Sequence, residues 1–204
     1  TAILFLSDNG ADGNTVLDEG QTREWARRHR DNSLDNTGRP GSFAEYGPGW
    51  AQVGSTPHNL YKAFMYEGGI AVPAIFSLPE RSLRDALTRA PAHVTDVAPT
   101  ILELAGVTPP GTTYQGREVA AMQGTSMRAL LTGKRATVHP VFRRGWELNG
   151  RRAMRVGDWK IVQANKPWGT GDWELYDLSK DRAERNDLAA RHPDKLKELV
   201  AEYD

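Results

Sequence analysis

The sequence lacks cysteine, a net charge and any long apolar run. Without cysteine, disulfides, thiolate metal sites and a cysteine nucleophile are excluded within these 204 residues. Lys and Arg number 26, as do Asp and Glu, so there is no electrostatic footprint for nucleic acid and we expect no nucleic-acid partner. No apolar run approaches the roughly 20 residues of a membrane-spanning helix, so we expect no membrane partner either. The length accommodates one sizeable core and a smaller appended unit.

The first ten residues predict a metal site. Thr1 to Leu6 form an apolar run typical of a central strand in a parallel sheet, and Ser7-Asp8-Asn9-Gly10 follow it directly. Ligands of open α/β sheets bind beyond the carboxyl ends of the strands, and a carboxylate beside an amide suits a hard divalent cation. Asp8 and Asn9 are therefore candidate metal ligands; taken alone, the pattern also fits an Asx-type turn. Because a central strand needs two neighbours, we expect half of this site to lie on upstream sequence.

The middle of the chain mixes long connections with short elements. Residues 11–57 are rich in Gly, Asp, Asn and Arg, which predicts irregular but ordered loops around one basic helix, Thr22 to Arg30. Ile70 to Phe76 predicts a strand, with Pro73 at an edge or a bulge. Thr95-Asp96 predicts the start of a helix over Val97 to Ala105. This helix would place Val97, Ile101, Leu104 and Ala105 on one face, and a short helix is expected to follow at Ser126 to Leu131.

From Val138 onward the pattern changes to short alternating segments. Strands are predicted at residues 142–148, 152–156, 159–162 and 174–178, with a tight turn at Gly157-Asp158. An amphipathic helix begins near Pro193. The predicted fold class is α/β followed by a small antiparallel sheet with a C-terminal helix, and the predicted domains are residues 1–135 and 136–204.

Several segments, in collinear order, resemble the type I sulfatases. They are Ser7-Asp8-Asn9-Gly10 after the apolar strand; Leu60 to Phe64 followed by Glu67 to Pro73; and Leu175 to Leu178 with Asp181, Glu184 and Asn186 to Ala189. Asp31 to Arg39 and Tyr46 to Gln52 resemble the bacterial arylsulfatase branch of that family. Each motif is weak alone, but the ordered set is specific.

The resemblance implies an alkaline-phosphatase-like α/β sandwich, with its N-terminal half absent, followed by a small antiparallel sheet. It implies hydrolysis of a small-molecule sulfate ester to an alcohol and sulfate. The nucleophile of such enzymes is a formylglycine made from the first residue of a Cys/Ser-x-Pro-x-Arg motif, and it lies beside one divalent cation, usually calcium (Ca2+).

Carried over to this sequence, the resemblance assigns three residues. Asp8 and Asn9 match metal ligands, and hard oxygen donors suit a metal that must bind sulfate and nucleophile oxygens. Lys62 matches the lysine that contacts the substrate sulfate, so it is a catalytic and substrate-binding candidate whose ammonium can neutralise developing charge. Without the resemblance, Lys62 would be interpreted as a solvated lysine on a helix face.

Two alternative functions remain. Phosphodiesterases and phosphonate monoester hydrolases of the same superfamily generally have His where this chain has Asn9, and an amide oxygen favours calcium over the softer metals that imidazole prefers. Asn9 therefore favours a sulfatase over a phosphodiesterase or a phosphonate monoester hydrolase. The other alternative is a non-enzymatic folded fragment whose exposed first strand associates with a second copy.

Ser77-Leu78-Pro79-Glu80-Arg81 fits the formylglycine motif letter for letter. In the family order, however, the nucleophile lies well upstream of the Asp-Asn-Gly strand. We interpret this match as a strand end, a proline turn and a helix that starts at Ser82. Because the nucleophile is then absent from these residues, we expect them to be catalytically incompetent alone and to bind calcium weakly.

The histidines and tryptophans receive structural interpretations. His58 is expected in a loop or at a pocket rim, and the other histidines at the surface or in helix caps: His29, His93, His139 and His192. Four tryptophans are expected in the core of the C-terminal sheet, with a lid role for the Trp168 loop as the alternative: Trp146, Trp159, Trp168 and Trp173.

Overall fold

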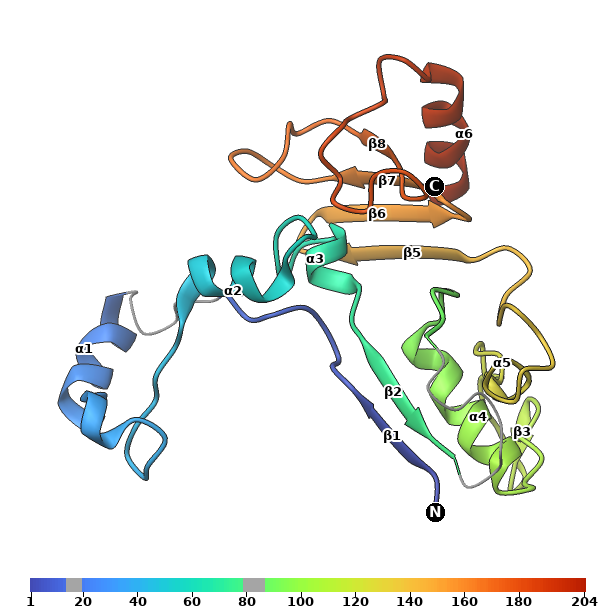
Figure 1. Cartoon of the computed structure of the whole chain (residues 1–204), viewed down its shortest axis with the longest axis horizontal. Helices are drawn as coiled ribbons and strands as arrows, with labels where there is room; N and C mark the ends of the chain where they lie inside the picture. Colours follow the sequence, from blue (N-terminus) through green and yellow to red (C-terminus); the bar gives the residue numbers. More distant parts are fainter. Residues whose placement is uncertain (14–19, 79–86) are drawn as a thin grey trace. The chain divides into compact units, whose positions relative to one another are not determined.

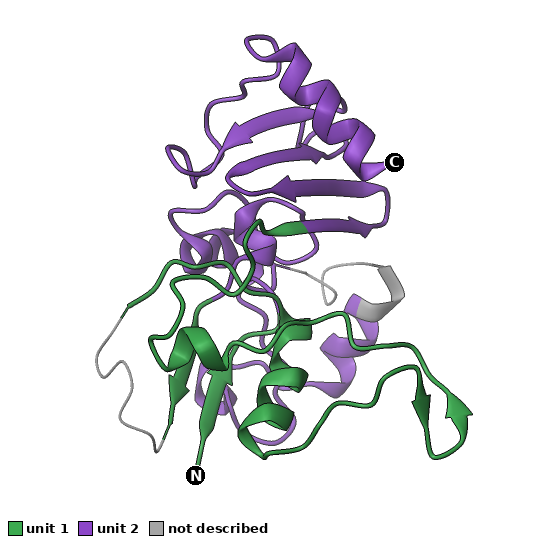
Figure 2. Ribbon diagram, turned by 90° about the vertical axis from the view of Figure 1, so that its right-hand side faces the viewer, with its two compact units in different colours: residues 1–8, 73–143 green, residues 9–72, 144–204 purple. Residues whose placement is uncertain are grey.

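The computed structural model describes residues 1–13, 20–78 and 87–204 (Figure 1). Contacts within the chain define two compact units, each built from two stretches of sequence (Figure 2). Unit 1 comprises residues 1–8 and 73–143, and unit 2 comprises residues 9–72 and 144–204. The division into residues 1–135 and 136–204 stays a prediction.

In unit 1, strand β1 (Ile3–Leu6) pairs antiparallel with β2 (Ala74–Ser77), with Leu6 opposite Ala74. The one neighbour of β1 among the described residues is therefore antiparallel, which corrects the expectation of a parallel pair, while a central position of β1 stays a prediction. An apolar run predicts a strand but does not specify the direction of its partner. The second strand also begins later than predicted. Residues Glu67–Ile70 form the short helix α3, and β2 starts immediately after Pro73, which has no N–H to donate.

Helix α4 (Val97–Leu104) forms as predicted, with Asp96 at its N-cap, although the Asp96 side chain makes no capping hydrogen bond to this helix. A 3-10 turn, η3 (Val94–Asp96), precedes it, and the His93 side chain accepts the Thr95 N–H. Val97, Ile101, Leu104 and Ala105 share one face as predicted, since all four line one hollow beside β1, but the helix buries Pro99 and Thr100 whereas Ile101 is 55% exposed. The hydroxyl of Thr100 explains the difference, since it donates to the Asp96 carbonyl and accepts the Met127 N–H at 2.8 Å.

Asp96 organises this part of unit 1. Its buried carboxylate accepts the N–H groups of His93 and Thr125, each at 2.8 Å, and its Oδ2 lies 2.8 Å from His139 Nε2. Burial alone would raise the pKa of Asp96, but these donors outweigh it and hold the pKa below its ordinary value. His139 is half-buried and pairs with Asp96, so the prediction of a surface or capping role is wrong for it. That role is confirmed for His29, His93 and His192.

The rest of unit 1 is a small helical core with one hairpin. Helix α5 (Arg128–Leu131) contributes Leu130 to a cluster with Met127 and Val138, close to the helix predicted at residues 126–131. Strands β3 (Thr113–Tyr114) and β4 (Arg117–Glu118) pair with each other.

Unit 2 is built on a four-stranded sheet in the order β5-β6-β7-β8, which confirms the strands predicted from the alternating pattern. The strands are β5 (Arg143–Leu148), β6 (Arg151–Val156), β7 (Trp159–Gln163) and β8 (Glu174–Asp177), and the β6–β7 and β7–β8 pairs are antiparallel. Helix α6 (Pro193–Tyr203) packs Leu199 against Met154, Ile161 and Leu175 on one face (Figure 1).

The other face of this sheet supports a loop-rich layer. Because side chains alternate along a strand, the neighbouring residues Ala153, Val162 and Tyr176 face the opposite side. There they pack against Tyr61, Phe64, Met65 and Tyr66 and against Ala51 of helix α2 (Gly47–Ser55). Helix α1 (Gly20–His29) confirms the predicted basic helix, and η2 (Leu34–Asn36) follows it. No helix among the described residues has the length and apolarity needed to cross a bilayer.

Three of the four tryptophans assigned to the C-terminal core pack there. Trp146 packs against the cluster that contains Tyr61, Phe64 and Tyr66. Trp159 and Trp173 pack against the cluster of Met154, Ile161, Leu175 and Leu199 beside α6. Trp168 is 44% exposed and is not a core residue, which corrects that prediction.

The Asp96 network yields a stability prediction. Asp96→Ala leaves the N–H groups of His93 and Thr125 without their acceptor in a buried site, so we expect it to lower the free energy of unfolding by about 3 kcal/mol. Denaturant-induced unfolding measures the change. Asp35→Ala, at an exposed acidic residue of η2, is the control and should change it by less than about 0.5 kcal/mol. Equal effects of the two variants would contradict the role assigned to Asp96.

Candidate functional site

Two loops distant in sequence lie side by side in unit 2, and they carry Asn9 and Lys62. The Gly10 N–H donates to the Gly69 carbonyl at 2.9 Å, and the Lys62 N–H donates to the Ala11 carbonyl at 3.0 Å. The approach at Gly10 is so close that a Cβ there would lie 1.9 Å from the Gly68 carbonyl oxygen. Only glycine permits this contact, so the Asp-Asn-Gly sequence needs its third residue for packing.

Lys62 lies in a strained, irregular segment. Leu60 and Ala63 have φ values of 56° and 74°, which residues with a side chain seldom adopt. The interpretation of Lys62 as a helix-face lysine is therefore wrong, since residues 59–66 form no helix. Its Nζ lies 2.9 Å from Asp12 Oδ2, and both side chains are partly exposed. Such strain is typical of sites where the surrounding structure imposes a conformation.

The neighbours of Lys62 fix this segment on the sheet. Arg151 of β6 donates from Nη1 to the Ala63 carbonyl at 2.9 Å, and its guanidinium lies 4.2 Å from the centre of the Phe64 ring. The Tyr61 ring lies directly against Gly13. The Asp12 N–H donates to the Tyr46 hydroxyl at 3.0 Å. The position of the Lys62 ammonium is therefore set by contacts from both the sheet and the first loop.

Behind this segment lies a buried ionic cluster. Lys160 is fully buried, and its Nζ lies 2.9 Å from Glu67 Oε1 and 2.7 Å from Glu184 Oε1. The Glu67 N–H donates to Glu184 Oε2 at 2.6 Å. Within the described residues Glu67 Oε2 accepts no hydrogen bond, and it faces the guanidinium groups of Arg155 and Arg182 at 4.0 and 3.9 Å. The cluster joins α3, which follows the Lys62 segment, to the sheet and to the loop after β8.

The two carboxylates of the cluster have opposite pKa shifts. Burial would raise the pKa of Glu67, but Lys160, with Arg155 and Arg182, outweighs it and holds the pKa below its ordinary value. For Glu184, burial and the nearby Glu67 charge prevail over Lys160 and raise the pKa to about 7. One carboxylate is thus ionised at all ordinary pH values, whereas the other titrates near neutrality.

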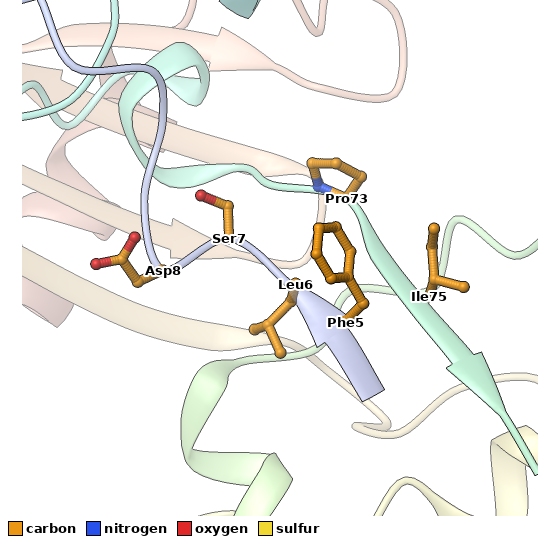
Figure 3. Close-up of a pocket in the computed structure, with 6 residues that line it drawn as sticks. All are labelled: Phe5, Leu6, Ser7, Asp8, Pro73 and Ile75. Atoms are coloured by element: carbon orange, nitrogen blue, oxygen red, sulfur yellow. The ribbon is translucent and has the colours of Figure 1, made fainter. Parts of the chain in front are cut away.

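Asp8 lies in unit 1, just beyond the carboxyl end of β1 (Figure 3). It is exposed and lies at one end of a hollow of about 460 Å³. The hollow is lined by Phe5, Leu6, Ser7, Asp8, Pro73 and Ile75, and the Asp8 carboxylate points away from the Phe5 ring (Figure 3). Asn9, the next residue, begins the first stretch of unit 2. Nowhere in residues 1–13, 20–78 and 87–204 do three or more His, Cys, Asp or Glu side chains gather in a way that could hold a metal ion.

Sequence reasoning missed Asp12 and the ionic cluster. A lysine within the apolar strand Trp159-Lys160-Ile161-Val162 was the available signal for the cluster, because a lysine at such a position must find buried carboxylates. No sequence signal paired Asp12 with Lys62. His58 lies in a loop as predicted, with its Nδ1 3.0 Å from the Arg182 carbonyl. Ser77 ends β2, while Pro79, Glu80, Arg81 and the predicted helix start at Ser82 lie outside the described residues.

Residues 57–202 match the protein family described as N-sulphoglucosamine sulphohydrolase, C-terminal. The chain belongs to this sulfatase family. An uncharacterized sulfatase of Schizosaccharomyces pombe is 41% identical over 203 residues, which are 98% of this chain and 36% of the relative. An arylsulfatase of Klebsiella aerogenes is 36% identical over 135 residues, which are 66% of this chain and 29% of that protein.

The structural comparison agrees. A Bacteroides thetaiotaomicron protein, from a genetic locus for the metabolism of multiple glycosaminoglycans, superposes with a TM-score of 0.62 and 25% identity. The match covers 98% of this chain and 37% of that protein. The predicted resemblance to a sulfatase C-terminal region and the predicted α/β fold class are confirmed. The chain spans about a third of the length of the relatives it matches, and the roles of Asp8, Asn9 and Lys62 stay predictions.

Glu184 provides a prediction for the pH dependence of stability. Its folded-state pKa of about 7 lies above the ordinary 4.5, so its contribution to stability is full below about pH 4.5 and is lost as the pH rises through 7. The loss amounts to about 3 kcal/mol at 1.36 kcal/mol per pH unit. Glu184→Gln does not titrate, so between pH 4.5 and 7 its free energy of unfolding should fall less steeply than that of the wild type.

Chemical unfolding at pH 5, 6, 7 and 8 measures this slope. Glu67 does not contribute to the slope in this pH range. Its folded-state pKa lies below 4.5, so its contribution to stability is lost only as the pH falls below that value. Glu198→Gln, at an exposed residue of α6 that is paired with Lys195, is the control and should keep the wild-type slope. A wild-type slope in Glu184→Gln would show that Glu184 does not titrate near neutrality.

Proposed function

We propose that the complete protein carrying this chain is a sulfuric ester hydrolase, of the arylsulfatase type, that cleaves a sulfate ester to an alcohol and sulfate. The family match carries this proposal, because it spans the Lys62 segment and the cluster behind it. The description of the family and the glycosaminoglycan locus of the structural relative favour a sulfated sugar as the substrate. The formylglycine nucleophile belongs to sequence outside these 204 residues.

In this proposal Lys62 contacts the sulfate. Backbone hydrogen bonds hold its loop against the loop that follows Asn9, and its ammonium is paired with the Asp12 carboxylate at 2.9 Å. Since it is partly exposed, it can turn from Asp12 to a sulfate oxygen without the cost of uncovering a buried charge. A positive charge fixed at this place stabilises the negative charge that grows on the ester oxygens as the bond breaks.

Asp8 and Asn9 would hold one calcium ion together with carboxylates from sequence outside the chain. Their donor chemistry fits, because a carboxylate and an amide carbonyl are both hard oxygen ligands. The Gly10–Gly69 hydrogen bond fixes the backbone next to Asn9. When bound, the ion would supply positive charge that polarises the sulfate.

Activity measurements on the complete protein test the function. We expect turnover of 4-nitrophenyl sulfate to exceed that of bis(4-nitrophenyl) phosphate, and Lys62→Ala to lower kcat/KM for the sulfate by roughly 100- to 1,000-fold. Lys180→Ala is the control, since Lys180 is also paired with an aspartate, Asp177, but is 83% exposed on the loop after β8. Residues 1–204 alone should show no turnover. Preference for the phosphate diester would instead assign a phosphodiesterase, and turnover by residues 1–204 alone would show that the nucleophile lies within them.

Calcium binding tests the metal ligands separately from turnover. Calcium should raise the thermal unfolding midpoint of the complete protein, and Asp8→Ala or Asn9→Ala should reduce that rise because each removes an oxygen donor. Asp35→Ala should leave it unchanged. Residues 1–204 alone, with two of the proposed donors, should show little calcium-dependent stabilisation. An unchanged calcium effect in both ligand variants would place the metal elsewhere.

The exposure of Ile3 and Phe5 supports the further proposal that residues 1–204, when produced alone, associate with a second copy through β1. The molar mass in solution measures this association.

A further inference from the structure

One aromatic side chain in unit 2 is exposed beside the Lys62 segment although its neighbours are buried. Trp168 is 44% exposed, whereas Tyr61 and Phe64, on which it rests, are 8% and 4% exposed. The Trp168 ring centre lies 5.1 Å from that of Phe64 and 6.4 Å from that of Tyr61. Trp168 thus contacts the two buried rings at interplanar angles of 57° and 78° and leaves part of its side chain open to solvent.

These contacts place Trp168 close to the proposed sulfate contact. The Tyr61 ring lies against Gly13, and the Lys62 ammonium is paired with the preceding residue, Asp12. Tyr61 and Lys62 therefore pack against the same dipeptide, and Trp168 lies on Tyr61. The indole and the lysine are thus connected through Tyr61 and the Asp12-Gly13 dipeptide, on one side of the same segment.

The loop that carries Trp168 is held firmly. The N–H groups of Trp168 and Gly169 both donate to the Asn165 carbonyl, and the Gly171 N–H donates to the Ala164 carbonyl at 3.0 Å. At Gly169 a Cβ would lie 2.6 Å from the Ala164 carbonyl oxygen and 2.9 Å from the Tyr66 hydroxyl. The Thr170 N–H donates to the buried Glu174 carboxylate at 2.9 Å.

The acceptor of that last bond is itself fixed. Glu174 also accepts the hydroxyl groups of Tyr66 and Tyr176, at 2.6 and 2.7 Å. A loop tied to a buried carboxylate in this way presents the indole in one position, so a ligand that stacks on it has no loop to order first. These bonds argue against the lid interpretation of the loop.

From this geometry we infer that the exposed face of Trp168 is a platform for the ring of the group esterified to the sulfate, with a saccharide ring as its ligand. The inference rests on the proposed function, because it takes Lys62 as the sulfate contact. When a saccharide ring stacks on an indole, the apolar face of the sugar is buried while the hydroxyl groups at its rim stay in water. Lys62 would then determine where the sulfate binds, and Trp168 would select esters that carry a ring.

Binding of sulfonates, in which a C–S bond replaces the ester and cannot be hydrolysed, tests this inference without turnover. Calorimetry on the complete protein would compare 6-deoxy-6-sulfoglucose, benzenesulfonate and ethanesulfonate, which present a sugar ring, an aryl ring and no ring. We expect Trp168→Ala to raise the Kd of the sugar sulfonate roughly three- to tenfold and that of ethanesulfonate less than twofold. Trp168→Phe, which keeps a smaller ring on Phe64 and Tyr61, should have an intermediate effect and serves if Trp168→Ala does not fold.

Trp25→Ala is the matched control, since Trp25 is 48% exposed and stacks on His29 of its own helix. It should leave all three Kd values unchanged. A loss confined to benzenesulfonate would identify an aryl ring as the ligand and overturn the saccharide assignment. Equal effects of Trp168→Ala on the three sulfonates, no effect on any, or no sulfonate binding by the wild type would overturn the platform itself. Turnover of 4-nitrophenyl sulfate by the wild type decides the proposed function separately, so the two failures are distinguishable.

Discussion

Unit 2 depends on the buried ion pairs that Lys160 makes with Glu67 and Glu184. The charge of Lys160 compensates Glu67 and Glu184, which come from the two sequence stretches of the unit, and an apolar side chain in its place would remove the one ammonium that both carboxylates contact. Glu67 begins α3, directly after the Lys62 segment, and Glu184 lies in the loop after β8. A single ammonium in the sheet therefore fixes the chain on both sides of the candidate site.

The rest of that site is assembled by backbone contacts that only small residues permit. Gly10, Gly68 and Gly69 bring the loop of Asn9 against the segment of Lys62, where a Cβ on any of them would overlap a carbonyl oxygen. The left-handed conformations of Leu60 and Ala63 are held in place by aromatic packing on the sheet and by the Arg151 hydrogen bond. Charge, glycine contacts and aromatic packing act together, so the conformation of the Lys62 segment is over-determined. This redundancy allows backbone strain to persist beside a group proposed to bind substrate.

The strands of the C-terminal sheet could be predicted from the sequence because their alternating pattern is local. Residues 143–163 alternate with a period of two, Gly157 supplies the turn, and the apolar face of α6 has helical spacing. The same reasoning failed for β1, where a continuous apolar run did not specify an antiparallel partner. For α4 it predicted the shared apolar face but missed Thr100, which is buried and hydrogen-bonds its neighbours whereas Ile101 is exposed. Hydrophobicity alone does not predict that a threonine is buried while the isoleucine next to it is exposed.

The sequence by itself identified the family and most of the regular elements, since motifs at fixed spacing are local information, and it predicted three site residues whose roles stay predictions. Only the tertiary structure paired Asp12 with Lys62, joined Glu67 to Glu184 through Lys160, and left Trp168 exposed beside the lysine segment. These are contacts between residues far apart in the chain, and their geometry depends on packing that no local pattern encodes. The Asp-Asn-Gly sequence shows both levels: its residue types indicated a metal site, while the need for its glycine became visible only against Gly68.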